Sequence, residues 1–230
     1  MNRSVKQMTG HKLGATDGHI GHIKDFYFDD ALWVVRYLVA DTGTWISGRL
    51  VLISPLALAG FDDSEKVLRV NLTRRQIENS PSIAEHKPIS RQYEEEYFQY
   101  YSWPFYWQGG SLWGWSELPI IPPQPLARPA PDLRAAAPRE DAHLRSAKAV
   151  LGYKAQGVDK EAGSIADFLI DDRNWTIRGL LVENGQWLHG HKTLVPAAQI
   201  ARISWTDSTV FLKTTHEALE RAPSYEPASA

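Results

Sequence analysis

The chain contains two copies of one sequence pattern, 142 positions apart. Residues 3–48 align without a gap on residues 145–190, and 18 of these 46 positions are identical. The agreement is densest at residues 21–38 and 163–180, where both copies read Gly-x-Ile-x-Asp-Phe-x-x-Asp-Asp-x-x-Trp and then Arg-x-Leu. Solenoid repeats recur every 20–50 residues or so, and this spacing is far longer. The sequence therefore predicts a duplicated domain.

Composition narrows the class of protein. A chain of 230 residues, 43% of them hydrophobic, suits two small globular domains. The formal net charge of −2 gives no electrostatic reason to expect a nucleic-acid partner. Cysteine is absent, which excludes disulfides, cysteine-ligated zinc and thiol nucleophiles. The first residues lack the apolar core of a signal peptide, and no apolar run is long enough to span a membrane. We expect a cytoplasmic protein without stable membrane insertion.

Each copy is predicted to begin with a β-hairpin. Residues 23–28 and 33–40 are rich in Val, Ile and aromatic residues and flank Asp29-Asp30, a pair typical of turns. The second copy repeats this arrangement at residues 165–170 and 175–182. A glycine turn then leads to a third predicted strand, which opens with Trp45 or Trp187.

A second hairpin and a short helix are predicted to close each copy. The hairpin strands are expected at residues 57–61 with 67–72, and at 199–205 with 209–213. The helices are expected at residues 73–80 and 215–222, each stopped by a proline. Five or six short antiparallel strands in so few residues favour a small closed β-barrel, since closure removes exposed strand edges. The predicted fold is all-β, with two six-stranded antiparallel barrels.

Two unlike segments separate the copies. Residues 93–115 hold 11 aromatic residues in 23, and residues 119–138 hold 7 prolines in 20. The proline-rich segment is expected to be an extended spacer, whereas the aromatic segment is too apolar to remain solvated. The predicted organisation is a first barrel at 1–90, an aromatic connecting segment at 91–118, a proline-rich linker at 119–143 and a second barrel at 144–230.

The ordered series of motifs resembles the PRC-barrel family, named for a domain of the photosynthetic reaction-centre H subunit. The likeness rests on the Gly-x-Ile-x-Asp-Phe-x-x-Asp-Asp-x-x-Trp core, the Arg-x-Leu strand and the Gly-x-Trp that follows. It is also similar to stand-alone bacterial members, in which a helix ending in Ser-Pro precedes an aromatic run. The resemblance covers residues 1–107 and 145–225. It implies β-barrel adaptors that bind other proteins and share no known reaction.

Charged and histidine residues have structural interpretations beside functional ones. Asp25 and Asp167 lie within strands and recur in both copies, so we expect them to stabilise the domains by bonding the neighbouring loop or by pairing with Arg36 and Arg178. A proton-transfer role is the alternative. The repeated Trp33 and Trp175 are assigned to the same structural role. The paired aspartates that follow are explained by turn formation, with a cation site as the alternative. His189 and His191 share one face of a strand and are weak candidates for metal ligands, because zinc needs a third ligand.

The aromatic segment is the main candidate for function. Its rings either pack within the chain or form an interface, since Tyr and Trp are favoured as interface anchors. The residues assigned to partner contact are Tyr101, Trp103, Tyr106, Trp107, Trp113 and Trp115. No catalytic motif stands out, so no catalytic residue or cofactor is assigned. The predicted function is a non-enzymatic adaptor acting through protein contacts, as a homodimer or an intramolecular pseudo-dimer. The alternative is a stress-related protein that binds a small ligand or metal.

Overall fold

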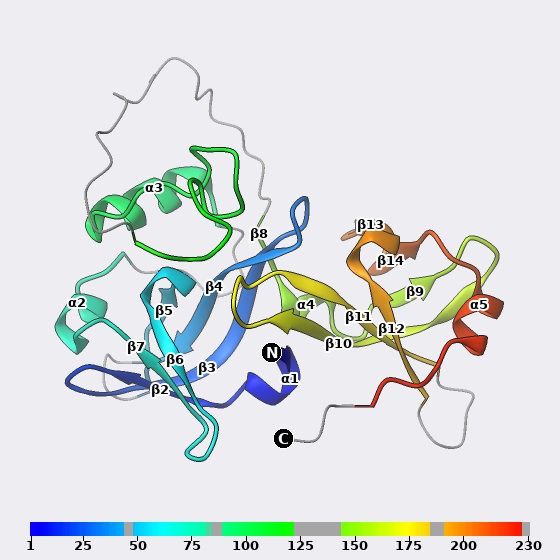
Figure 1. The fold of residues 1–230 in the computed structure, drawn as a ribbon, viewed down its shortest axis with the longest axis horizontal. Helices are drawn as coiled ribbons and strands as arrows, with labels where there is room; N and C mark the ends of the chain where they lie inside the picture. The colour runs from blue at the N-terminus through cyan, green and yellow to red at the C-terminus, as the bar shows by residue number, and fades with distance from the viewer. Residues whose placement is uncertain (44–47, 82, 84–88, 122–143, 185–190, 227–230) are drawn as a thin grey trace. The chain divides into compact units, whose positions relative to one another are not determined.

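The computed structural model describes residues 1–43, 48–81, 83, 89–121, 144–184 and 191–226, which fold mostly into β-strands (Figure 1). The strands form two seven-stranded sheets, one in each of two compact units. Unit 1 comprises residues 1–8, 147–172 and 176–230, and unit 2 comprises residues 9–146 and 173–175. The units therefore interleave along the chain, whereas the sequence had indicated consecutive domains. No helix in the described part of the chain is both long and apolar enough to cross a membrane.

The two sheets share one strand order. In unit 2 the order is β5 (Leu50–Ile53), β4 (Val34–Asp41), β3 (Gly18–Asp29), β2 (Lys12–Ala15), β7 (Val67–Val70) and β6 (Leu58–Asp62), with β8 (Leu144–Ser146) also paired to β3. In unit 1 the order is β12 (Lys192–Pro196), β11 (Ile177–Glu183), β10 (Glu161–Asp171), β9 (Lys154–Gln156), β14 (Thr209–Leu212) and β13 (Ile200–Ser204), with β1 (Asn2–Ser4) also paired to β10.

The expectation of closed six-stranded barrels is wrong. Each sheet has seven strands, and the pairings among the described residues do not join the two end strands of either sheet. The reason lies in the connection between the two end strands of each sheet. The 3₁₀ turns η1 (Pro55–Ala57) and η2 (Ala197–Gln199) carry the chain from one end strand to the other without a hairpin ladder. The coarser prediction of a mainly β fold is confirmed.

The predicted first hairpin of each copy is confirmed as β3–β4 and β10–β11. In unit 2 the first aspartate of the pair forms the turn, as expected: the Oδ1 of Asp29 accepts hydrogen bonds from the amides of Ala31 and Leu32. Trp33 and Trp175 follow this turn in the left-handed conformation, with φ values of 55° and 63°. Trp33 stacks on Phe28, with ring centroids 5.8 Å apart.

A glycine identical in both copies is required by close backbone packing. A Cβ atom at Gly21 would lie 2.0 Å from the carbonyl oxygen of Asp41, and one at Gly163 would lie 2.3 Å from that of Glu183. Both glycines also have positive φ values, 151° and 134°. Any side chain there would push apart the first hairpin, so the shared glycine is a requirement of the fold.

The second hairpins and the short helices are also present. They are β6–β7 with α2 (Arg74–Glu78), and β13–β14 with α5 (His216–Arg221). Thr73 and Thr215 cap the two helices by accepting hydrogen bonds from backbone amides in the first turn. The predicted strand openings at Trp45 and Trp187 lie outside the described residues. The remaining short helices are α1 (Val5–Met8) and α4 (Ala147–Val150).

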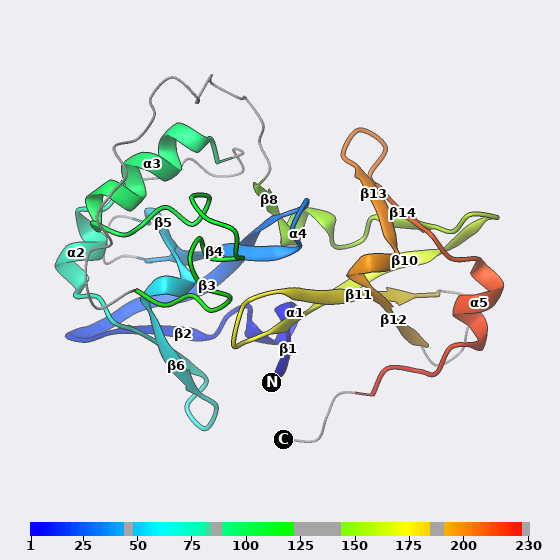
Figure 2. The same ribbon diagram turned by 45° about the horizontal axis from the view of Figure 1, so that its top comes forward.

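The aromatic segment of unit 2 begins with a helix that the sequence had not predicted. Helix α3 (Arg91–Tyr100) is capped by the Ser90 hydroxyl, which accepts a hydrogen bond from the Tyr93 amide. It lies beside β4 and β5 (Figures 1 and 2), where the Tyr97 hydroxyl donates to the carbonyl of Leu52 at 3.0 Å. Because the helix and the following chain cover it, β4 is buried on both faces from Val34 to Ala40.

Candidate interaction sites

Each unit presents a length of strand edge that its own neighbouring strand cannot cover. In unit 2, β2 pairs only with the first part of β3, from Gly18 to His22. The same edge of β3 continues to Asp29, and there it pairs with β8 through Tyr27, Phe28 and Asp29. An uncovered strand edge is open to pairing with any extended segment. We call residues 27–29 of β3, together with the carboxylates of Asp25 and Asp30, the strand-docking site of unit 2.

Two side chains of the docked strand are bound by these aspartates. The Ser146 hydroxyl donates a 2.5 Å hydrogen bond to Oδ2 of Asp25. The other oxygen of Asp25 accepts from the amide of Phe26 at 2.7 Å, so both carboxylate oxygens are used. The Nε atom of Arg145 lies 3.7 Å from a carboxylate oxygen of Asp30. An Arg-Ser dipeptide is thus bound by its backbone and by both of its side chains.

The strand-docking site of unit 1 is built in the same way on β10. Strand β1 pairs with β10 through Leu169, Ile170 and Asp171. The Ser4 hydroxyl donates to Asp167, which also accepts from the amide of Phe168 at 2.8 Å. Nε of Arg3 donates a 2.7 Å hydrogen bond to Asp172. Strand β1 runs along β10, and β8 runs along β3; all four strands are labelled in Figure 2.

Each docked strand belongs by sequence to the other repeat. Strand β1 opens the first repeat, most of which forms unit 2, yet β1 belongs to the sheet of unit 1. Strand β8 opens the second repeat and belongs to the sheet of unit 2. The repeats have therefore exchanged their first strands. Residues 173–175, the tip of the second repeat's hairpin, also belong to unit 2, where Trp175 stacks on Phe61 with centroids 6.2 Å apart.

The predicted ion pairs of Asp25 with Arg36 and of Asp167 with Arg178 are not the pairs that these arginines form. Arg36 lies 3.6 Å from Asp29, and Arg178 pairs with Asp171. The strand register is the reason, because Asp25 lies opposite Val39 and Asp167 opposite Leu181, away from the arginines. Both inner aspartates instead hold the serine of a docked strand, and they remain structural residues.

Replacing Asp25 with alanine should destabilise unit 2 by about 2–3 kcal/mol, because the Phe26 amide and the Ser146 hydroxyl lose a charged acceptor in a buried site. Ser146→Ala removes one of these bonds and should cost less. Urea denaturation measures both effects. The control is Ser64→Ala, which deletes an exposed serine–aspartate bond and should leave the midpoint almost unchanged. Equal stability of Asp25→Ala and the control would refute the role given to the carboxylate.

Most of the residues assigned to partner contact pack within unit 2. Trp103, Tyr106 and Trp113 are buried, and Tyr101 and Trp107 are half-buried. The rings contact one another closely: Tyr101 stacks on Trp103, with centroids 4.5 Å apart, and Phe105 stacks on Trp107 at 4.7 Å. Trp115 differs from the rest, because 63% of its surface is exposed. Of the six, Trp115 is the one left fully accessible to a partner.

Two arginines pack against these rings, and one of them is buried. Arg36 is only 1% exposed, and its guanidinium carbon lies 3.9 Å from the centroid of the Tyr106 ring and 5.0 Å from that of Trp113. Its Nη1 atom donates to the carbonyl of Leu112 at 2.5 Å. Its charge is balanced by Asp29, 3.6 Å from Nη2, and by the ring faces, whereas its buried Nε atom makes no hydrogen bond to the described residues. Arg91, at the start of α3, lies 4.2 Å from the centroid of Trp107.

Glu94 joins α3 to the sheet and was missed by the sequence analysis. One of its oxygens accepts hydrogen bonds from Tyr106 at 2.6 Å and from Tyr37 at 3.1 Å, and the other lies 3.0 Å from Arg91. Burial raises the pKa of Glu94, although Arg91 and the two hydroxyls oppose the shift. Burial and the Glu94 charge likewise raise the pKa of Tyr37 and of Tyr106. The cluster is a packed polar network that fixes α3, and Glu94 lines neither of the two cavities described below.

The raised pKa of Glu94 predicts a specific pH dependence of stability. A carboxyl whose folded pKa lies above its unfolded value of 4.5 binds more protons when folded, so its contribution to the free energy of unfolding falls as the pH rises above 4.5. The difference in stability between wild type and Glu94→Gln should therefore shift against wild type from pH 4.5 upward. Urea denaturation at a series of pH values measures this difference. A difference that grows in favour of wild type as pH rises would contradict the assignment.

The exposed apolar residues of unit 2 cluster after the aromatic core. Trp115 is followed by Leu118, Ile120 and Ile121, which are exposed by 45%, 56% and 46%. We call residues 115–121 the apolar stretch. Ile121 also lines a cavity of about 530 Å³, whose wall includes Tyr100, Tyr101, Trp103, the end of η1 and the two residues after β7. Among the described residues, those lining this cavity carry no Asp, Glu, Lys, Arg or His side chain.

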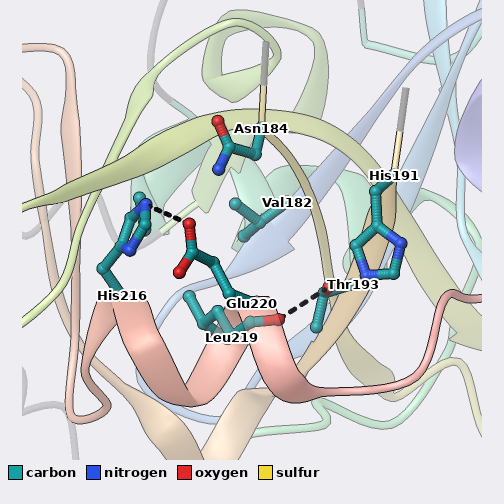
Figure 3. Close-up of a pocket in the computed structure, with 8 residues that line it drawn as sticks. Val182, Asn184, His191, Thr193, His216, Leu219 and Glu220 are labelled. Atoms are coloured by element: carbon teal, nitrogen blue, oxygen red, sulfur yellow. Dashed lines mark hydrogen bonds and ion pairs between the residues drawn. The ribbon is translucent and has the colours of Figure 1, made fainter. Parts of the chain in front are cut away.

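A smaller pocket, of about 110 Å³, lies in unit 1 and contains one of the predicted metal candidates (Figure 3). His191 borders it, with its Nε2 atom 3.2 Å from the carbonyl oxygen of Ala222. His216 and Glu220 of α5 line the pocket from the helix side, with Nε2 of His216 3.5 Å from the Glu220 carboxylate. His189 lies outside the described residues. Within the described ranges, no three His, Asp or Glu side chains gather to hold a metal ion.

No protein-family model matches this chain, and no curated protein sequence matches it. The resemblance to the PRC-barrel family therefore stays a prediction from the motif series.

Proposed function

We propose that the chain is a non-enzymatic adaptor that binds a partner protein through the apolar stretch and the adjoining cavity of unit 2. The observation that carries the proposal is the exposure of four large apolar side chains in seven residues, beside a cavity walled by aromatic rings. Exposed apolar patches of this kind mark interaction surfaces, and Trp is favoured as an anchor in them. The resemblance to the PRC-barrel family supports an adaptor role, and a cytoplasmic location is part of the same proposal.

The partner is inferred to present an uncharged, apolar segment. The cavity wall offers Leu56, Leu72 and the rings of Tyr101 and Trp103, with polar groups from Asn71, Gln76 and Ser102. A charged segment would lose its hydration there without gaining a counter-charge, which is costly. An apolar side chain entering the cavity would bury surface beside Ile121 while the backbone of the segment meets the polar groups at the rim.

The test is binding of the partner by surface variants of the purified chain. Partners captured by wild type are identified, purified and titrated against Trp115→Ala and Ile121→Ser. Loss of a central Trp anchor costs about 2 kcal/mol or more, so the dissociation constant should rise about thirtyfold. The matched control is Val158→Ser, which changes an exposed apolar residue of unit 1 and should leave affinity unchanged. Equal affinity of all four proteins would exclude the apolar stretch as the binding surface.

A small-ligand site is the second candidate function, and the pocket of unit 1 favours it. The pocket brings His191 to the same hollow as His216 and Glu220, whose side chains can hydrogen-bond a polar ligand or contribute to binding a cation. If the pocket of unit 1 binds a cation, calorimetric titration with Zn²⁺ should show stoichiometric binding that is lost in both His191→Gln and His216→Gln. Absence of binding to wild type, or equal binding by the variants, would exclude it.

A further inference from the structure

The two strand-docking sites are equivalent in chemistry and in register. Arg145 and Ser146 of β8 lie opposite Phe28 and Tyr27, and Arg3 and Ser4 of β1 lie opposite Ile170 and Leu169. Phe28 and Ile170 occupy the same position of the repeat, as do Tyr27 and Leu169. Both sites bind the serine with the inner aspartate and the arginine with the second aspartate of the pair.

The Arg-Ser contacts therefore do not depend on which repeat supplies the strand. They are made with the edge of β3 or β10 and its aspartates, whereas the flanking residues differ: Leu144 of β8 also bridges to Ile89, and the Met1 amine before β1 binds Asp172. Within one chain each docked strand is far in sequence from the strand it pairs with: β8 ends the stretch 9–146 of unit 2, and β1 is separated from the rest of unit 1 by that same stretch. The same contacts would form if the strand came from a different molecule. Exchange of an identical element between copies is a low-cost route to dimers for this reason.

We propose that a second copy of this chain can supply the docked strand, giving a strand-exchanged dimer in which β8 of each copy pairs with β3 of the other. The dimer keeps the Ser146–Asp25 hydrogen bond and the Arg145–Asp30 ion pair, each now formed between copies. Docking within one chain is favoured at low protein concentration, because the effective concentration of a tethered strand is high. The dimer should therefore form at high concentration or after refolding. The inference is independent of the apolar stretch proposed as the partner site.

A charge reversal divided between two chains tests the exchange. Arg145→Glu places a carboxylate against Asp30, and Asp30→Arg places a guanidinium against Arg145, so each single variant is mismatched within its own chain. In an equimolar mixture, the new carboxylate at position 145 of one variant meets the new guanidinium at position 30 of the other. The unchanged Arg145 of the second variant meets the unchanged Asp30 of the first in return. We expect the mixture to shift to twice the monomer mass of 25.9 kDa in light scattering, under conditions where each variant alone stays monomeric.

The matched control is the single chain that carries both changes, Arg145→Glu with Asp30→Arg. Its charges are matched again within one molecule, so it should return to the monomer–dimer balance of wild type. The Trp115→Ala variant serves as a second control, since it alters the apolar stretch and should leave the exchange unchanged. A mixture that stays monomeric, while the doubly changed chain is as stable as wild type, would overturn the proposal.

Wild-type protein gives an independent measurement that needs no altered residue. Chains unfolded in urea and refolded together at high concentration should yield dimers that persist on dilution, because separating exchanged strands requires opening of the sheet. Hydrogen exchange should show the amides of residues 27–29 equally protected in monomer and dimer, since β3 is paired in both. Monomers at every refolding concentration, or dimers that lack protection at these residues, would overturn the proposal.

Discussion

In each sheet, a hydrogen bond from the serine of the docked strand to a buried aspartate stabilises the long strand, β3 or β10, to which that strand pairs. Strands β3 and β10 are longer than the strands that precede them, and the edge left open is closed by an Arg-Ser strand from the other repeat. The aspartate directs one oxygen to the serine and the other to its own strand. It thereby satisfies the local backbone and fixes the register of the seventh strand, which completes the pairing of the hairpin.

The two units differ most where the aromatic segment covers one of them. Arg36 is enclosed by Tyr106 and Trp113, whereas its counterpart Arg178 is about half exposed. The aromatic segment follows only the first repeat, and its packing buries Arg36, whose counterpart in the second repeat stays partly exposed. The rings around Arg36 pack within unit 2, and hydrogen bonds to Glu94 connect Tyr106 and Tyr37 to α3. What remains accessible is the apolar stretch, and the adaptor role is proposed for that surface.

Local patterns predicted the hairpins, their turns and the capped helices closely, because alternation, Asp-Asp turns and Thr caps act over a few residues. The closure of the sheets and the partners of Arg36 and Arg178 were predicted wrongly, because both depend on register between distant residues. Helix α3 was not predicted, because the aromatic composition of residues 93–115 indicates packing without indicating a helix. Helical signals were present: a Ser90 cap, and apolar residues at 93, 97, 98 and 101 on one face. Glu94 offered no comparable signal, since its burial depends on Tyr37, which is far away in sequence.

By itself the sequence determined that one domain pattern occurs twice, and it placed Asp, Arg, Ser, Gly and Trp at equivalent positions in both copies. The tertiary structure decided which copy's strand fills which docking site. Both strands carry Arg-Ser and both edges carry the same carboxylates, so the repeated residues alone do not say which strand fills which site. The choice depends on how the chain connects the strands, because each contact joins residues far apart in sequence, 121 positions for Ser146 and Asp25 and 163 for Ser4 and Asp167.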